Sequence, residues 1–139
     1  MSVVKYNDAE VKLLARLMRA EAEGDGKQAM LMVGNVGINR VRARCLDFKN
    51  ITSITKMVYQ RPGGFECTLY SYFYQAAREK DKQLAKRVIN GERFAPATRS
   101  LWFYNPFGEE CRTTWYGQYN VGYYKSHCFY APDVNENCY

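Results

Sequence analysis

The spacing of apolar residues near the N-terminus predicts an amphipathic helix over 8–22. Its apolar positions recur at helical intervals and share one face: Val11, Leu14, Ala15, Met18 and Ala22. Asn7 is a suitable N-cap, and Glu10 follows it three residues later, as in a capping box. Gly24 and Gly26 end the helix, because glycine is favoured just beyond a helix C-terminus.

Similar patterns predict four more helices, over 26–41, 53–59, 69–77 and 81–89. Gly34 and Gly37 lie inside the first of these. Because glycine weakens a helix, we expect them to permit the close approach of another backbone, such as that of the first helix, or of a sugar ring. Pro62, Gly63 and Gly64 predict a loop over 60–66.

The pattern changes after Pro96, where aromatic residues dominate. Segments 100–104 and 122–130 are predicted as strands. Alternation along the second places Lys125, His127 and Phe129 on one face. The chain is therefore predicted to be an α+β protein, with a helical N-terminal two thirds and a small antiparallel sheet, forming a single domain over 1–139.

Composition and charge narrow the possible partners. The chain has 139 residues and a net charge of +6, which favours polyanions such as nucleic acid, anionic lipid or anionic cell-wall glycan. Its basic residues are scattered, and it has no RNA-binding signature, so nucleic acid is the weaker alternative. No apolar run is long enough to span a membrane. The N-terminus lacks the apolar core of a signal peptide, so we expect synthesis in a cytosol without a cleaved leader.

The five cysteines are Cys45, Cys67, Cys111, Cys128 and Cys138. None are spaced as C-x-x-C, and there is one histidine, so no zinc or other metal site is expected. Free thiols are the expectation for a reducing cytosol. In an oxidising outer layer, the odd thiol could cross-link the protein to a neighbour.

Glu21 is the residue with the most specific chemistry. It borders the apolar face of the first predicted helix and lies in its last turn. Burial and the negative end of the helix dipole both disfavour the charged carboxylate, so both would raise its pKa. A carboxyl group kept neutral in this way is suited to general acid catalysis of glycosidic bond cleavage. The structural alternative is a helix-end residue paired with Arg16 or Arg19.

Other candidates for a cleft come from loops and strand ends. Phe65 and Glu66 follow the glycine-rich loop. Asn39 shares a helix face with Asn35, four residues earlier. The remaining candidates lie in the aromatic C-terminal third, as Tyr104 beside Asn105, Tyr116 beside Trp115, and His127.

Several motifs together resemble the CwlJ/SleB cell wall hydrolases, the spore cortex-lytic enzymes of endospore-forming bacteria. They are Leu13-Leu14-Ala15-Arg16, Ala20-Glu21-Ala22-Glu23-Gly24, Val36-Gly37-Ile38-Asn39-Arg40-Val41, Val58-Tyr59-Gln60, Trp102-Phe103-Tyr104-Asn105-Pro106 and Lys125-Ser126-His127-Cys128-Phe129-Tyr130. The resemblance covers nearly the whole chain, and the short length is similar to the CwlJ branch.

The resemblance implies cleavage of cortex peptidoglycan glycan strands during germination, by a domain similar to goose-type lysozyme and lytic transglycosylases. It implies that Glu21 is the single essential acid. From their placement in loops, on a helix face and in strands, we expect the substrate-binding residues to be Phe65, Glu66, Asn39, Tyr104, Asn105 and His127. It implies a place at the boundary of spore coat and cortex, a coat protein as partner, and calcium dipicolinate as an activator. No cofactor is expected for the chemistry itself.

Several alternatives stay open at this stage. After Glu21 gives up its proton, water can attack with the help of a second carboxylate or of the substrate's acetamido group, or the muramic sugar's own hydroxyl can close an anhydro ring. Glu66, Glu23 and Asp25 are the possible second acids, and Glu66 could equally be a helix N-terminal residue. A different class of function is a non-catalytic spore coat protein that only binds glycan.

Overall fold

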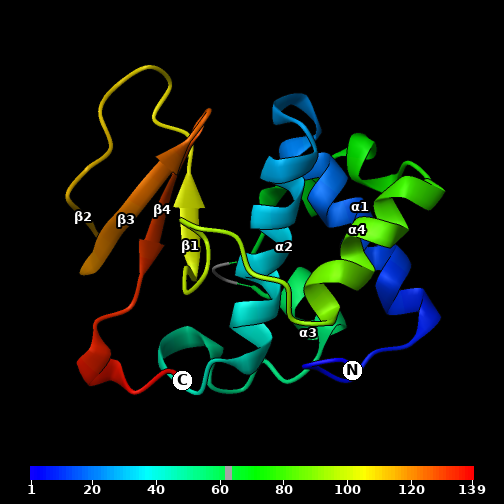
Figure 1. The fold of residues 1–139 in the computed structure, drawn as a ribbon, viewed down its shortest axis with the longest axis horizontal. Helices are drawn as coiled ribbons and strands as arrows, with labels where there is room; N and C mark the ends of the chain where they lie inside the picture. The colour runs from blue at the N-terminus through cyan, green and yellow to red at the C-terminus, as the bar shows by residue number, and fades with distance from the viewer. Residues whose placement is uncertain (62–63) are drawn as a thin grey trace.

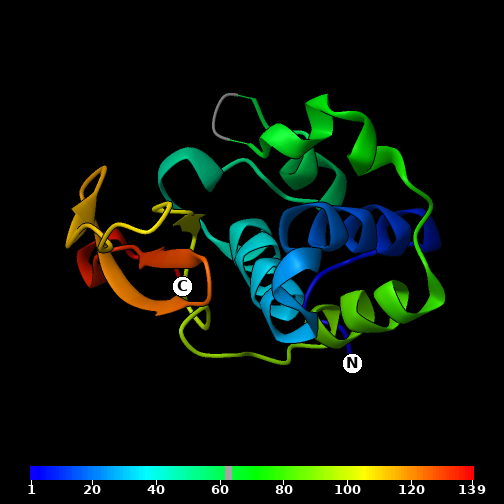
Figure 2. The ribbon, with the colours of Figure 1, turned by 90° about the horizontal axis from the view of Figure 1, so that it is seen from above.

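The computed structural model, which describes residues 1–61 and 64–139, pairs a group of helices with a small antiparallel sheet (Figures 1 and 2). The helices are α1 (Asp8–Ala22), α2 (Lys27–Arg42), α3 (Ile54–Val58) and α4 (Glu79–Ile89). The strands are β1 (Trp102–Tyr104), β2 (Thr114–Trp115), β3 (Gln118–Tyr124) and β4 (His127–Ala131). Figure 1 shows the helices on one side and the sheet on the other, with α2 between them. The predicted α+β class is confirmed.

Helix α1 forms over the predicted range. The side chain of Asn7 caps it by accepting a hydrogen bond of 2.8 Å from the backbone N–H of Glu10. After Ala22 the chain makes a 3₁₀ turn, η1 (Glu23–Asp25). Gly26 then adopts φ +92°, a conformation that glycine takes without strain and that allows α2 to start in a new direction.

Helix α2 is buried along most of its length, because α1, α3 and α4 pack on one side and the sheet covers the other. Its two glycines make this packing possible. A Cβ atom on Gly34 would lie 2.9 Å from Val88 Cγ2 and 3.0 Å from Met18 Cε, and one on Gly37 would lie 2.9 Å from Met57 Cε. The predicted close approach is therefore made by side chains of neighbouring helices, and the suggestion of another backbone or a sugar ring was wrong.

The segment 69–77 was predicted as a helix and is not one. It contains parts of two 3₁₀ turns, η3 (Glu66–Leu69) and η4 (Ser71–Tyr74). Only Phe73 of η4 is buried, so this stretch has no apolar face long enough to hold a regular helix against the core. Residues 62–63 of the predicted loop over 60–66 lie outside the described residues.

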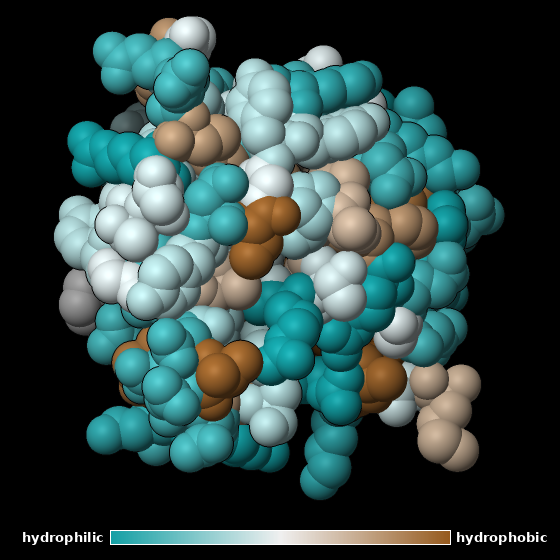
Figure 3. All heavy atoms as spheres, turned by 60° about the vertical axis from the view of Figure 1, so that its left-hand side comes forward, coloured by the Kyte–Doolittle hydropathy of each residue, from teal (hydrophilic) through white to brown (hydrophobic). Residues whose placement is uncertain are grey.

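The sheet has the strand order β1-β4-β3-β2, with every neighbouring pair antiparallel. The segment predicted as one strand, 122–130, is a hairpin, because the chain turns at Lys125 with φ +53°. Lys125 therefore does not alternate with His127 on one strand. The outward side of β3 exposes Tyr119, Val121 and Tyr123, and Figure 3 shows hydrophobic residues scattered among hydrophilic ones on the sheet side of the molecule.

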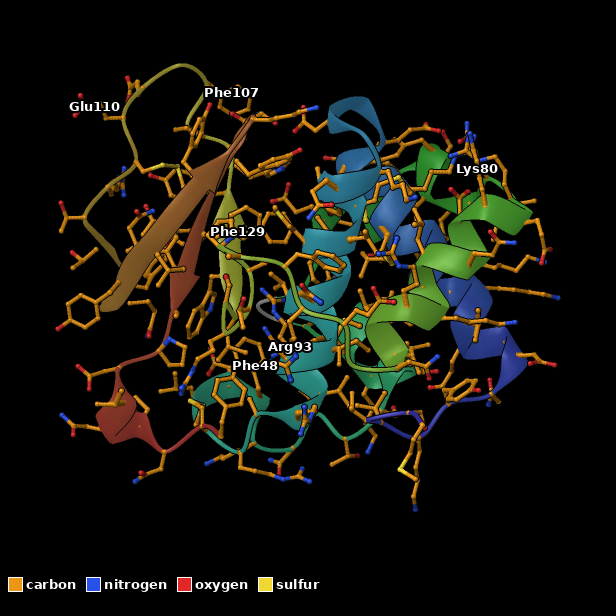
Figure 4. All side chains as sticks on the ribbon, viewed as in Figure 1. Phe48, Lys80, Arg93, Phe107, Glu110 and Phe129 are labelled. Atoms are coloured by element: carbon orange, nitrogen blue, oxygen red, sulfur yellow. A yellow bond between two sulfur atoms is a disulfide. The ribbon has the colours of Figure 1, made fainter. Side chains whose placement is uncertain are left out.

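The sheet meets the helices through a small apolar cluster. Phe129 of β4 lies between the sheet and α2 (Figure 4), packed with Met32 and Val36. A separate cluster forms where α2 ends, around Phe48 and Leu101. Two asparagines of α2 fix the segment that leads from α4 into β1. Asn35 donates to the carbonyl of Glu92 at 2.7 Å and accepts from the backbone N–H of Phe94 at 2.8 Å.

Four of the five cysteines form disulfides, which corrects the expectation of free thiols. Cys45 pairs with Cys138, 93 residues later, and Cys111 pairs with Cys128, 17 residues later. Cys67 is the free one and is buried. The pairs could not be recognised from spacing, since each depends on the folded path of the C-terminal third. Along the described residues, no helix is long and apolar enough to cross a lipid bilayer.

Candidate active site

A cavity of about 1100 Å³ opens where α1 and α2, the segment after α3 and the sheet meet. Six of the seven residues predicted for the site line it: Glu21, Phe65, Glu66, Tyr104, Asn105 and His127. They come from four separate parts of the chain. Most of the residues predicted for the site therefore lie together along one cavity.

Glu21 lies in the last turn of α1, half-buried at the edge of the apolar core. Burial is the main cause that raises its pKa above the usual value for a glutamate. The negative charge of Glu66 adds to this rise, while a hydrogen bond from Cys67 and the positive charge of Arg40 reduce it. The net shift is upward, so the carboxyl group holds its proton at higher pH than an exposed glutamate would.

The arginines expected to neutralise Glu21 are engaged elsewhere. Arg16 donates to the carbonyl of Phe73 at 3.1 Å and stacks over the Phe73 ring. Arg19 pairs with Glu23 at 3.3 Å. The structural alternative for Glu21, a surface ion pair with one of these arginines, is therefore wrong.

Arg40 is a cavity residue that sequence analysis missed. It is 5 % exposed and lines the cavity together with Glu21. Its Nε donates to the carbonyl of Leu101 at 2.8 Å, and its guanidinium lies 4.6 Å from the centre of the Phe65 ring. Burial lowers its pKa to about 10, so it remains charged at neutral pH. The sequence held one signal for it: Arg40 is a charged residue within the mostly apolar stretch that forms the buried part of α2.

Cys67 was also missed. Its thiol hydrogen-bonds to the Glu21 carboxyl group, and its side chain is 2 % exposed. Burial, and then the nearby charge of Glu21, raise the pKa of the thiol far above its usual range. It therefore stays protonated and acts as a donor to Glu21. No pattern in the sequence connects two residues that are so far apart along the chain.

Phe65 and Glu66 lie beside Glu21 but differ in role. Phe65 is 5 % exposed, packs against Phe103 and contacts the Arg40 guanidinium with its ring. Glu66 is exposed in the cavity and is the first residue of η3. Its place at the start of a helical turn and on the cavity is compatible with both alternatives, a second catalytic carboxylate and a helix N-terminal residue.

The opposite wall of the cavity is aromatic. The Tyr104 ring lies 4.8 Å from the Trp115 ring and 5.6 Å from the Tyr130 ring. A hydrogen bond with Tyr130 lowers the pKa of Tyr104, whose hydroxyl also accepts from the backbone N–H of Arg112. The side chain of Asn105 accepts from the backbone N–H of Phe107 at 2.7 Å, which fixes the rim of the cavity. Tyr116 also lines the cavity and is 84 % exposed.

Asn39 does not belong to the site. Its side-chain amide donates to the carbonyls of Ala97 and Ser100, at 3.1 and 2.9 Å, and it is 1 % exposed. The prediction was wrong because the polar face of α2 meets the segment before β1 instead of a cleft. Asn39 fixes the position of that segment and so has a structural role.

His127 lines the cavity from the start of β4 and is 9 % exposed. Its Nδ1 lies 3.3 Å from Asp25 Oδ2, on the turn just after α1. Burial lowers its pKa, while the charge and hydrogen bond of Asp25 raise it, and the net direction is downward. The ring is therefore neutral at neutral pH.

A second, smaller pocket of about 270 Å³ also lies against Glu21. It is lined by Arg19, Ala20, Glu21, Glu23, Gly24, Tyr72 and Gln75. Glu21 therefore lines both pockets. An extended substrate that occupied both would have Glu21 at an internal position.

Comparison with known proteins identifies the family. A family described as Cell Wall Hydrolase matches residues 24–130, a range that begins just after Glu21. A protein named Cell wall hydrolase CwlJ from Oceanobacillus iheyensis is 68 % identical over 132 residues, which cover 95 % of this chain and 93 % of that protein. One of the same name from Bacillus subtilis is 55 % identical over 141 residues, covering 100 % of this chain and 98 % of that protein.

Solved structures agree on the fold. The catalytic domain of Bacillus cereus SleB superimposes with a TM-score of 0.66 and 21 % identity, covering 91 % of this chain and 92 % of that one. The catalytic domain of the germination-specific lytic transglycosylase SleB from Bacillus anthracis gives a TM-score of 0.72 at 18 % identity, covering 90 % and 96 %. The chain belongs to the cell wall hydrolase family and, within it, to the proteins named CwlJ.

Proposed function

We propose that this protein cleaves the glycan strands of spore cortex peptidoglycan during germination, with Glu21 as the general acid. The observation that carries the proposal is the half-buried Glu21 carboxyl group, whose pKa is raised by burial and which opens into a cavity of about 1100 Å³. The names of the relatives, cell wall hydrolases and a germination-specific lytic transglycosylase, support the substrate and the setting.

In the proposed reaction, Glu21 delivers its proton to the leaving glycosidic oxygen while positive charge develops at the anomeric carbon. The two pockets that Glu21 lines would hold the sugars on each side of the scissile bond. The aromatic wall around Tyr104 and Trp115 offers flat apolar faces with polar edges, which suit sugar rings. The attacking group is water or the muramic sugar's own hydroxyl, and these give a reducing end or an anhydro end.

The test is product analysis on purified cortex fragments by mass spectrometry. Replacement of Glu21 by Gln should lower the turnover rate by about 10²- to 10⁴-fold, the usual contribution of a general acid. Glu23→Gln is the matched control, since Glu23 belongs to the same helix end but is exposed and paired with arginines. Near wild-type cleavage by Glu21→Gln would refute the assignment. Binding without cleavage by the wild-type protein would favour the glycan-binding coat protein instead.

The stability of Glu21→Gln as a function of pH tests the raised pKa of Glu21 and shows whether the variant folds. The pKa of Glu21 is higher in the folded than in the unfolded protein, where it is about 4.3. Below the unfolded pKa the carboxyl group is protonated in both states and does not destabilise the fold. As pH rises through the folded pKa, the buried group must ionise, and the free energy of unfolding falls. Glu21→Gln should therefore be more stable than the wild type at neutral pH, with the difference smallest at acid pH. Thermal unfolding at several pH values measures this.

The setting of the reaction is part of the proposal. We place the protein at the boundary of spore coat and cortex, with a coat protein as its partner and calcium dipicolinate as an activator. Running the cleavage assay with and without calcium dipicolinate tests the activator directly. An unchanged rate would mean that calcium dipicolinate does not activate the protein directly, and it would leave the role of Glu21 unaffected.

A further inference from the structure

His127 and Asp25 connect the sheet to the end of the helix that carries Glu21. Asp25 ends η1, three residues after Ala22, and its Oδ2 lies 3.3 Å from Nδ1 of His127. The Ser126 hydroxyl donates to the same carboxylate oxygen. Lys125 Nζ donates to the backbone carbonyl of Asp25 at 3.0 Å. The β3–β4 turn is thus attached to the chain just after α1, which places His127 and Glu21 in one cavity.

These contacts determine which nitrogen of His127 can meet a substrate. With Asp25 accepting at Nδ1, the proton of the neutral ring belongs on Nδ1 and the lone pair on Nε2. Within the part of the chain that the structure describes, the ring's hydrogen-bond contacts involve Nδ1, from Asp25 and Ser126. Phe103 packs edge-on against the ring, with centroids 5.2 Å apart, and restricts its rotation. Nε2 is therefore the nitrogen left for a group in the cavity.

The arrangement differs from a serine nucleophile triad. Ser126 Oγ lies 3.4 Å from Nδ1, the same nitrogen that Asp25 holds, and its hydroxyl is bonded to the Asp25 carboxylate. A nucleophilic serine would instead contact Nε2, opposite the carboxylate. Ser126 thus strengthens the attachment of Asp25, and the reactive side of the ring faces away from it.

We propose that His127, oriented by Asp25, is the general base of the glycan cleavage reaction. The inference rests on the proposed function. Nε2 of His127 takes the proton of the attacking hydroxyl, whose oxygen forms a bond to the anomeric carbon. The bond from that carbon to the glycosidic oxygen breaks as Glu21 gives its proton to the leaving oxygen. Afterwards the protonated His127 returns a proton to the Glu21 carboxylate through water, which restores both groups without net change.

This assignment removes the need for a second carboxylate. Glu66 is exposed, while Glu23 is paired with Arg19 and Arg78. His127 is neutral at neutral pH because burial lowers its pKa more than Asp25 raises it, so it is ready to accept a proton. The charged and titratable groups around it are Asp25 on η1, Lys125 in the turn, Tyr124 on β3 and, in the shared cavity, Glu21, Arg40, Asp47, Arg61, Glu66, Tyr104 and Tyr116.

The test is the pH dependence of turnover on purified cortex fragments. A mechanism in which Glu21 acts alone as the acid gives only an alkaline limb, whereas a separate base adds an acidic limb. His127→Gln should lower turnover by about 10²- to 10⁴-fold at neutral pH and remove the acidic limb. Asp25→Asn should shift that limb to lower pH, because the Asp25 charge raises the pKa of His127. Ser126→Ala, which keeps both groups, is the matched control for the loss of a turn contact.

The outcomes separate this proposal from the one on which it rests. If Glu21→Gln abolishes cleavage but His127→Gln keeps the acidic limb, Glu21 remains the acid and the base assignment is wrong. A lower rate with an unchanged pH profile would give His127 a structural role and overturn the proposal. If His127→Gln does not fold, Asp25→Asn still decides, since an unmoved acidic limb contradicts the assignment. Cleavage by Glu21→Gln at the wild-type rate would refute the proposed function itself.

Discussion

The helical region over 8–89 buries one large apolar cluster, whereas the sheet region over 97–138 shares two small clusters with it. One disulfide lies within the sheet region, and a second joins Cys138 to Cys45 of the helical region. The two regions also line opposite sides of the cavity. The helical side brings charged and acidic groups, Glu21 and Arg40, held against apolar surroundings. The sheet side brings aromatic rings and a neutral imidazole.

This difference separates two requirements of the proposed reaction. A carboxyl group keeps its proton to higher pH when it is buried in apolar surroundings, and the edge of the large apolar cluster supplies these for Glu21. Recognition of a sugar chain needs an open surface of rings, which the sheet can expose because disulfides replace part of the stability that burial would give. The Asp25–His127 contact links the two regions beside the cavity.

The largest expected effect comes from removing the disulfides that hold the sheet region. Cys45→Ala with Cys138→Ala should lower the free energy of unfolding by about 4–5 kcal/mol, since the link closes a loop of about a hundred residues. The Cys111–Cys128 disulfide closes a much shorter loop, so Cys111→Ala with Cys128→Ala should lower the free energy of unfolding by about 3 kcal/mol. Urea unfolding under oxidising conditions measures both.

The same experiment can show whether the two regions unfold separately. Both tryptophans, Trp102 and Trp115, lie in the sheet, so fluorescence reports on the sheet region while far-ultraviolet circular dichroism reports mainly on the helices. In the variant without the Cys45–Cys138 link, we expect the fluorescence transition at lower urea than the dichroism transition. Coincident transitions would mean that the molecule unfolds as one cooperative unit.

A smaller effect should follow from changing the aromatic wall. Trp115→Ala removes a ring that packs against Tyr104 and lines the cavity. Loss of one aromatic contact of about 0.5–1.5 kcal/mol should raise the KM for soluble cortex fragments by roughly two- to tenfold, with kcat little changed. Tyr123→Ala on the outer side of β3 is the control, since Tyr123 is 57 % exposed. A fall in kcat as large as that of Glu21→Gln would mean that the sheet side takes part in the chemistry beyond His127.

The two regions also differ in how far the sequence predicts them. Helix α1 and the place of Glu21 were predicted within a residue, because helix periodicity and end signals are local. The disulfides, the β3–β4 turn and the Asp25–His127 contact were not predicted. Cys45 and Cys138 are 93 residues apart, and Asp25 and Ser126 are 101 apart, so their meeting depends on the whole fold.

The prediction of Asn39 as a site residue failed for the same reason. A polar side chain on a helix can face a cleft or satisfy buried carbonyls, and spacing alone does not distinguish these cases. Its hydrogen bonds to Ala97 and Ser100 require knowing where the segment before β1 runs. Arg40 and Cys67 were missed because their interaction with Glu21 arises only in the folded structure and leaves no periodic pattern in the sequence.

The smallest effect, and the finest test of the helical side, concerns Cys67. Its hydrogen bond favours the charged form of Glu21 and so lowers the pKa of that carboxyl group, against the larger effect of burial. Cys67→Ala should therefore raise the pKa of Glu21 further and move the alkaline limb of the pH–rate profile to higher pH. Cys67→Ser keeps a donor of similar size, so its alkaline limb should lie closer to that of the wild type. A limb that moves to lower pH in Cys67→Ala would show that the thiol supports the protonated carboxyl group instead.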